Sequence, residues 1–168
     1  MNEDPANDVQ FQLDPENPKQ DRHVLHVDDD PDFLRLVNKK LSIQGITVTS
    51  QPDPREAIKT RIECGAQVVL LDVNMPWIDG ITLTEEMKKQ DGGTQVIMLT
   101  GLVSLSTVLE SMRKGAEACI FKPLNDYDEL LTVVDACFEK SERWWHSLQD
   151  LCDRRNGSQP AAFPELAK

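Results

Sequence analysis

Five short apolar segments alternate with five longer amphipathic segments between residues 22 and 140. The third apolar segment, Val68–Leu71, is an uninterrupted aliphatic run, which is typical of a parallel strand buried on both faces. Alternation of this kind predicts a parallel sheet with helices on both faces. We expect strands over residues 23–27, 46–50, 68–71, 96–99 and 118–121.

The segments between these strands carry helical signals. Asp53, Pro54 and Glu56, for example, supply the capping residue, the proline and the acidic side chain that typically open a helix. We expect helices over residues 31–44, 53–64, 81–90, 105–114 and 126–153.

Right-handed crossovers leave few topologies for such a chain. We predict an α/β fold, a flavodoxin-like (βα)5 doubly wound parallel sheet with strand order 2-1-3-4-5 and an extended C-terminal helix. The sequence has no Gly-x-Gly-x-x-Gly after its first strand and no Gly-x-x-x-x-Gly-Lys-Ser/Thr motif. A dinucleotide-binding fold and a P-loop NTPase are therefore disfavoured.

Polar side chains stand at the carboxyl ends of four expected strands. Asp28 and Asp29 follow the first strand, Asp72 ends the third, Thr100 ends the fourth and Lys122 follows the fifth. Ligands of open α/β sheets bind at this edge. Carboxylates that lie together repel unless a cation joins them, and Mg²⁺ prefers oxygen ligands. The pattern therefore predicts a Mg²⁺ site.

The same group of residues suits phosphoryl transfer. A carboxylate such as Asp72, held near Mg²⁺, can attack a phosphoryl group and form an aspartyl phosphate. The Lys122 ammonium would neutralise charge on the phosphoryl oxygens, and the Thr100 hydroxyl can donate a hydrogen bond to them.

Each motif also has a simpler interpretation. The Asp run can be a solvated turn, and Asp30 or Asp32 can be only a helix cap or a first-turn charge. An EF-hand loop is excluded, because Phe33 replaces the required glycine and Lys39 stands where the bidentate glutamate belongs. The joint placement of all four elements at successive strand ends favours the phosphoryl-transfer site.

At this point the sequence resembles the response-regulator receiver family of two-component signalling, the CheY-like superfamily. The resemblance covers about residues 22–140, and its motifs follow one another in order: VDDDP (27–31), LLDVNMPWIDG (70–80), MLTG (98–101) and FKP (121–123).

The resemblance implies residue roles. Asp72 would be the phosphoacceptor, and Asp28 with Asp29 the acidic pair. The direct metal ligands would be Asp29, Asp72 and the backbone carbonyl of Asn74.

Three further roles follow from the resemblance. Thr100 would be the switch hydroxyl and Lys122 the phosphate-pairing lysine, joined to Pro123 by a cis peptide. Asn74 and Leu102 occupy positions that tune loss of the phosphate in this family.

One position departs from the family pattern. Cys119 stands three residues before Lys122, where the family usually has a rotating aromatic residue. A small thiol cannot swing between buried and exposed states as an aromatic ring does. Phe121, the nearest aromatic residue, should share the side of the strand that Cys119 occupies.

We therefore expect a stand-alone receiver that accepts a phosphoryl group from a sensor histidine kinase or a phosphotransfer protein and signals to a downstream protein target. It would be a switch with intrinsic autophosphorylation and autodephosphorylation activity, not a turnover enzyme. One alternative is a non-switching receiver-like scaffold, which Cys119 favours. Another is an aspartyl-phosphate phosphatase, which typically carries a second Asp where this chain has Asn74.

His26 is an unusual residue in the first strand. Alternation places it on the same side of that strand as Asp28. A neutral histidine at the edge of the core is a more common arrangement than a pH sensor of the acidic site.

The charge and hydropathy of the chain exclude some partners. The net charge is −11, from 29 acidic and 18 basic residues, so direct nucleic-acid binding is not expected. No apolar run approaches the roughly 20 residues of a membrane helix, and the acidic N-terminus does not resemble a signal peptide. We expect a cytoplasmic protein.

The sequence beyond the receiver continues with helical spacing. We divide the chain into a flexible acidic tail (1–21), a receiver domain (22–140), an extension of the last helix (141–153) and a flexible C-terminal tail (154–168). The last helix would be about 42 Å long at 1.5 Å per residue, so its end would overhang a compact domain. Trp144 and Trp145 in that overhang need cover, which favours a homodimer or a partner-docking helix over simple packing against the same chain.

Overall fold

The computed structural model describes residues 22–101 and 104–155 of the 168-residue chain. The predicted N-terminal tail (1–21) and the position of Leu102 lie outside the described residues. So does the predicted C-terminal tail (154–168), except for its first two residues, which belong to the last helix. Five parallel strands form one sheet in the order β2-β1-β3-β4-β5, as predicted. The strands are β1 (His23–Val27), β2 (Thr47–Gln51), β3 (Val68–Asp72), β4 (Gln95–Thr100) and β5 (Ala118–Phe121).

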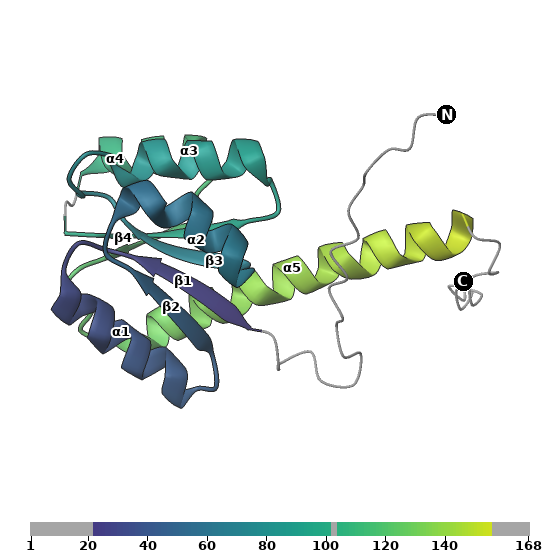
Figure 1. Cartoon of the computed structure of the whole chain (residues 1–168), viewed down its shortest axis with the longest axis horizontal. Coiled ribbons are helices and arrows are strands. Elements are labelled where there is room, and N and C mark those ends of the chain that lie inside the picture. The colour runs from purple at the N-terminus through teal and green to yellow at the C-terminus, as the bar shows by residue number, and fades with distance from the viewer. Residues whose placement is uncertain (1–21, 102–103, 156–168) are drawn as a thin grey trace, which may run out of the picture.

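Helices cover both faces of the sheet (Figure 1). One face carries α1 (Pro31–Ile43) and α5 (Tyr127–Arg155), and the other carries α2 (Ala57–Cys64), α3 (Gly80–Gln90) and α4 (Leu105–Arg113). This arrangement confirms the doubly wound α/β fold and its extended last helix.

The apolar core has two layers, one on each side of the sheet. Alternate β-strand residues point to opposite layers, so Val24 packs with α1 and α5, whereas Leu25 packs with α2 and α3. Both β3 and β4 are buried along their whole length. Two buried central strands make the sheet a rigid base for the loops at its carboxyl-end edge.

The second helix begins differently from the prediction. Residues Pro54–Glu56 form a separate 3-10 turn before α2 starts at Ala57. The Asp53 side chain accepts a hydrogen bond from the Arg55 backbone N–H at 3.0 Å, and the Glu56 N–H bonds to the Asp53 carbonyl at 3.1 Å. These short-range bonds tighten the first turn into 3-10 geometry.

The last helix, α5, is longer than the sheet on which it packs (Figure 1). It begins at Tyr127, one residue after the predicted start, and ends at Arg155, two residues after the predicted end. Its first half packs on the sheet through Leu130, Val134 and Phe138. Its second half extends past the sheet (Figure 1). Within the described parts of the chain, no helix has the length and hydropathy needed to cross a membrane.

Candidate functional site

Three aspartates meet at the carboxyl-end edge of β1 and β3. Asp28 and Asp72 are buried and Asp29 is exposed, and one carboxylate oxygen from each lies within 4.8 Å of the other two. The Asp28 carboxylate is oriented by the Asp30 backbone N–H, which donates to its Oδ1 at 2.9 Å. The sequence therefore identified correctly which three carboxylates the fold brings together.

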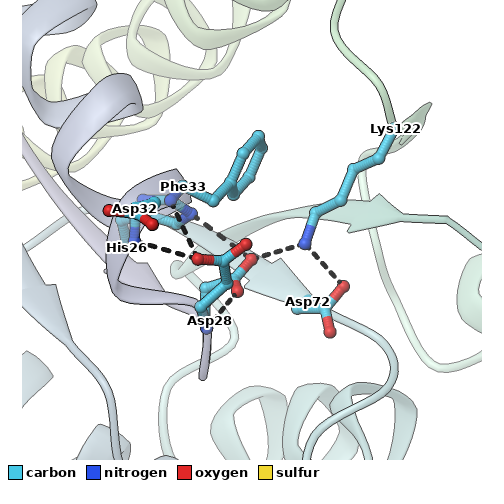
Figure 2. Close-up of polar contacts among 7 residues, drawn as sticks. His26, Asp28, Asp32, Phe33, Asp72 and Lys122 are labelled. Atoms are coloured by element: carbon cyan, nitrogen blue, oxygen red, sulfur yellow. Dashed lines mark hydrogen bonds and ion pairs between the residues drawn. The ribbon is translucent and has the colours of Figure 1, made fainter.

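The Lys122 side chain contacts both buried aspartates. Its ammonium donates to Asp28 Oδ2 at 2.5 Å and to Asp72 Oδ1 at 3.0 Å (Figure 2). A single ammonium among three carboxylates leaves the cluster anionic. Such a cluster electrostatically favours the binding of a cation.

The loop after β5 brings Lys122 to this position. The Lys122 backbone N–H donates to the Thr100 carbonyl at 2.8 Å, which ties the end of β5 to the end of β4. The Lys122–Pro123 peptide is cis, as the family resemblance implied. Thr100 is fully buried at the end of β4, in register with Phe121. The edge thus holds the predicted hydroxyl residue beside the predicted lysine.

Burial dominates the electrostatics of Asp72. Loss of solvent raises the pKa of its carboxyl above the ordinary value. The hydrogen bond and charge of Lys122 lower this pKa, while Asp28 and Asp29 raise it. The balance is a raised pKa, so the site disfavours the ionised form of Asp72 unless more positive charge arrives.

The donor set fits Mg²⁺. Mg²⁺ holds oxygen ligands at about 2.1 Å, so two opposite ligands lie about 4.2 Å apart. One carboxylate oxygen of each aspartate lies within 4.8 Å of the other two, so a single ion can reach all three after small side-chain movements. Asn74, whose backbone carbonyl was also expected to bind the metal, lies in the loop after β3 with its side chain exposed. Its carbonyl remains a prediction.

The loop between β3 and α3 is fixed at both ends. The Gly80 N–H donates to the Val73 carbonyl at 2.9 Å, and the Asp79 side chain caps α3 by accepting from the Thr82 N–H at 2.9 Å. A Cβ on Gly80 would lie 2.1 Å from the Asp72 carbonyl oxygen. Only glycine therefore allows α3 to start so close to the strand that carries Asp72.

Trp77 occupies the middle of this loop, and no sequence pattern indicated its conformation. Its φ is +68°, and a hydrogen bond of 2.9 Å from the Ile78 N–H to the Pro76 carbonyl closes a three-residue turn around it. A non-glycine residue in this region is strained, and such strain is concentrated at functional sites. The indole is 70% exposed, and the Arg55 guanidinium lies 4.3 Å from its ring centre.

His26 and Phe33 lie behind the aspartates on the face that carries α1. The Lys122 ammonium is 4.3 Å from the centre of the Phe33 ring, and the His26 ring meets Phe33 edge-on at 5.5 Å. The periodicity of α1 predicted Phe33 only as a core residue, so its contact with Lys122 was missed. His26 is fully buried, and burial, with a further contribution from the Lys122 charge, lowers its pKa to about 3. The expectation of a neutral histidine is confirmed.

Cys119 lies where the family resemblance led us to expect an aromatic residue. Its thiol is partly buried against the core layer beneath α2 and α3, and burial raises its pKa. Phe121, two residues nearer the site, is 40% exposed.

The comparisons with known proteins agree with this geometry. The family model described as the response regulator receiver domain matches residues 24–135. Among curated proteins, the regulatory protein AtoC of Escherichia coli is 31% identical over 116 residues, which are 69% of this chain and 25% of AtoC. PrrA of Mycobacterium tuberculosis is 30% identical over 100 residues, which are 60% of this chain and 43% of PrrA. The chain thus spans a quarter to a half of the length of these relatives.

Solved structures show the same fold. A CheY-like receiver domain protein from Methanospirillum hungatei has a TM-score of 0.69 at 28% identity, covering 73% of this chain and 97% of its own. The receiver domain of the Francisella response regulator 1452 has a TM-score of 0.67 at 30% identity, covering 71% and 98%. CheY in a CheX–CheY–BeF3–Mg²⁺ complex from Borrelia burgdorferi has a TM-score of 0.65 at 29% identity, covering 69% and 88%.

Proposed function

The chain belongs to the response regulator receiver family, and on that premise we propose that Asp72 accepts a phosphoryl group from a sensor histidine kinase or a phosphotransfer protein in a Mg²⁺-dependent reaction. The observation that carries the proposal is the position of Lys122, which contacts both Asp28 and Asp72 in a cluster of three carboxylates. A lysine that only neutralised a structural carboxylate would need one partner.

The transfer step assigns a role to each side chain. An Asp72 carboxylate oxygen forms a bond to the donor's phosphorus as the bond from phosphorus to the donor atom breaks, and its electron pair leaves with the donor. Lys122 exchanges its contacts with Asp28 and Asp72 for a phosphoryl oxygen, and the Thr100 hydroxyl donates to another. When bound, Mg²⁺ supplies positive charge that keeps Asp72 ionised and neutralises the phosphoryl oxygens.

Two observations support the Mg²⁺ requirement. The three aspartates gather their carboxylate oxygens within 4.8 Å of one another, and Mg²⁺ prefers such oxygen ligands. The related CheY from Borrelia burgdorferi was solved in a complex with BeF3 and Mg²⁺.

Intact-mass measurement tests the proposal directly. The full chain is incubated with a small phosphodonor such as acetyl phosphate, with Mg²⁺ or with a chelator. We expect the wild type to gain one phosphoryl group only with Mg²⁺, and Asp72→Ala to gain none. Asp32→Ala is the matched control, because Asp32 is an exposed aspartate of α1 and should leave the mass gain intact. Absence of a mass gain on the wild type would favour the non-switching scaffold.

The two rival functions meet different obstacles. The scaffold finds support only in Cys119, whereas the aspartates and Lys122 are assembled in contact. A phosphatase would carry a second carboxylate at the position of Asn74. Steady turnover of a phosphoester would support the phosphatase. The stand-alone and cytoplasmic assignments remain predictions.

We further propose that the overhanging end of α5 pairs with a second copy of this chain. Trp144, Leu148 and Leu151 continue the apolar stripe of the helix and are 65%, 49% and 58% exposed. Residues 141–155 contain three acidic and three basic residues, so their net charge is 3 − 3 = 0, against −11 for the whole chain. A neutral segment is where two copies of an acidic protein repel least.

The mass of the protein in solution tests this pairing. We expect a dimer for the wild type and a monomer for the double variant Trp144→Ala with Trp145→Ala. Leu36→Ala is the control, because Leu36 is an exposed apolar residue on α1 and should leave the dimer intact. A monomeric wild type, or a double variant with unchanged mass, would refute the pairing.

A further inference from the structure

The most unusual polar group outside the proposed transfer chemistry is the His26 imidazole. The ring is fully buried in β1, and neither of its nitrogens has a hydrogen-bond partner among the residues that the structure describes. A neutral imidazole always carries one N–H, and buried donors are nearly always paired in native proteins. An unpaired buried N–H therefore calls for a partner that another state of the site supplies.

The nearest acceptor is the Asp28 carboxylate. His26 Nε2 lies 3.9 Å from Asp28 Oδ2, the same oxygen that Lys122 contacts at 2.5 Å (Figure 2). A donor–acceptor distance of about 2.9 Å makes a hydrogen bond, so an approach of about 1 Å would pair the two groups. The other oxygen of Asp28 is already fixed by the Asp30 N–H at 2.9 Å.

The surroundings of the ring restrict it to this one role. Phe33 holds the ring from the α1 side at an interplanar angle of 72°. With its proton on Nε2, the imidazole places an N–H donor 3.9 Å from Asp28 Oδ2.

We propose that His26 is a positioning residue for Asp28, whose Nε2–H takes over Oδ2 when Lys122 turns from Asp28 to the phosphoryl group. The inference rests on the proposed function, because only phosphoryl transfer draws Lys122 away. Asp28 then keeps a donor on each oxygen, and its carboxylate stays oriented toward the metal. Donors of this kind behind metal-binding carboxylates sustain metal affinity.

Metal affinity of the full chain tests the inference, without any phosphoryl transfer. Mg²⁺ is titrated in the presence of beryllofluoride, and binding is followed by calorimetry. We expect His26→Leu, which retains an apolar filler of the pocket, to weaken Mg²⁺ binding about tenfold. His26→Gln can place an amide N–H near the Nε2 position and should recover most of the affinity.

His23→Leu is the matched control. His23 lies on the same strand at the end away from the site and hydrogen-bonds Thr49 at 2.8 Å, so its loss should leave Mg²⁺ affinity unchanged. Thermal unfolding of all three variants shows whether they fold. If His26→Leu does not fold, the comparison of His26→Gln with the wild type still decides, because the inference requires their affinities to agree within about threefold.

A spectroscopic readout separates positioning from simple packing. In the wild type with Mg²⁺ and beryllofluoride, nitrogen NMR should show a neutral His26 with its proton on Nε2 and slow exchange of that proton. A proton on Nδ1, or a folded His26→Leu that binds Mg²⁺ as the wild type does, would overturn the inference. Failure of the wild type to bind Mg²⁺ at all would instead refute the proposed function.

Discussion

The carboxyl-end edge of the sheet and the overhanging end of α5 are both left incomplete by the fold, but in opposite ways. At the sheet edge, three carboxylates share one ammonium, so the deficit is of positive charge. Along α5 beyond residue 141, the charges sum to zero and four large hydrophobic residues are exposed, so the deficit is of apolar contact; these residues are Trp144, Trp145, Leu148 and Leu151.

This difference tells us what kind of ligand each region can accept. A cluster of carboxylates is completed by a small cation and then by a phosphoryl group, both of which fit inside the domain. An apolar helical stripe is completed only by a surface of similar length, which must come from elsewhere. The phosphorylation and the pairing that we propose would therefore take place in chemically separate regions.

Loss of the shared ammonium should produce the largest effect. Lys122→Gln removes the positive charge that contacts Asp28 and Asp72, and we expect phosphorylation by a small donor to slow about 100-fold or more. Time-resolved intact mass measures the rate. Lys59→Gln on the surface of α2 is the control, and an equal rate for the two variants would show that the sheet edge does not depend on its lysine.

The close approach of α3 to the sheet edge is the next test. Gly80→Ala would place a methyl group 2.1 Å from the Asp72 carbonyl oxygen. We expect the free energy of unfolding to fall by about 2–3 kcal/mol, measured by chemical denaturation. Gly92→Ala is the matched variant, because nothing lies within 4 Å of the added carbon, and it should be nearly neutral. A neutral Gly80→Ala would mean that this edge is more pliable than its contacts indicate.

Arg22 tests where the domain ends and the overhang begins. Its guanidinium donates to Asp135 at 2.7 Å, lies 3.6 Å from Glu142, and sits 5.2 Å from the centre of the Phe138 ring. Arg22→Ala should lower the free energy of unfolding by about 1 kcal/mol. Arg35→Ala, whose partner is the exposed Asp32, should have less effect. Equal losses of unfolding free energy in the two variants would show that Arg22, which directly precedes β1, does not stabilise α5.

The smallest expected effect is a pH-dependent gain from Asp72→Asn in the absence of metal. Because burial raises the pKa of Asp72, the folded state binds its proton more tightly than the unfolded state. Stability of the wild type therefore falls as pH rises from the ordinary aspartate pKa to the raised one, and then stays level. Asn has no such proton, so the variant should be more stable than the wild type above that window, with a smaller difference below it.

Denaturation curves at several pH values measure this gain, and Mg²⁺ should reduce it. A variant that is less stable than the wild type at neutral pH without metal would contradict the burial argument.

The sequence was sufficient to predict which residues gather at the sheet edge, because strand ends follow from periodicity and the crossover rule leaves few strand orders. Asp28, Asp72 and Lys122 can be placed in one region without any knowledge of their rotamers. The ring contacts were not predictable in the same way. Phe33 over Lys122 and Arg55 over Trp77 depend on side-chain directions between segments, and residues of the same periodicity can point elsewhere.

The boundaries of elements were less predictable than their order. The 3-10 turn before α2 arises from two local hydrogen bonds at Asp53. The same residues can also open an α-helix, so the sequence does not distinguish the two geometries. The unpaired nitrogens of His26 could not be foreseen at all, because a missing hydrogen bond has no sequence pattern.

The loop after β3 is short, and hydrogen bonds hold both of its ends. The Gly80 N–H donates to the Val73 carbonyl, which joins the two ends of the loop, and Asp79 caps α3. Rearrangement is therefore confined to the few residues between Val73 and Asp79. Trp77 stands at the middle of that span, in a turn already under tension. Because the ends of the loop are held, a small displacement at Asp72 would move Trp77 more than the residues at the ends. The exposed indole of Trp77 would report that movement as a change in fluorescence.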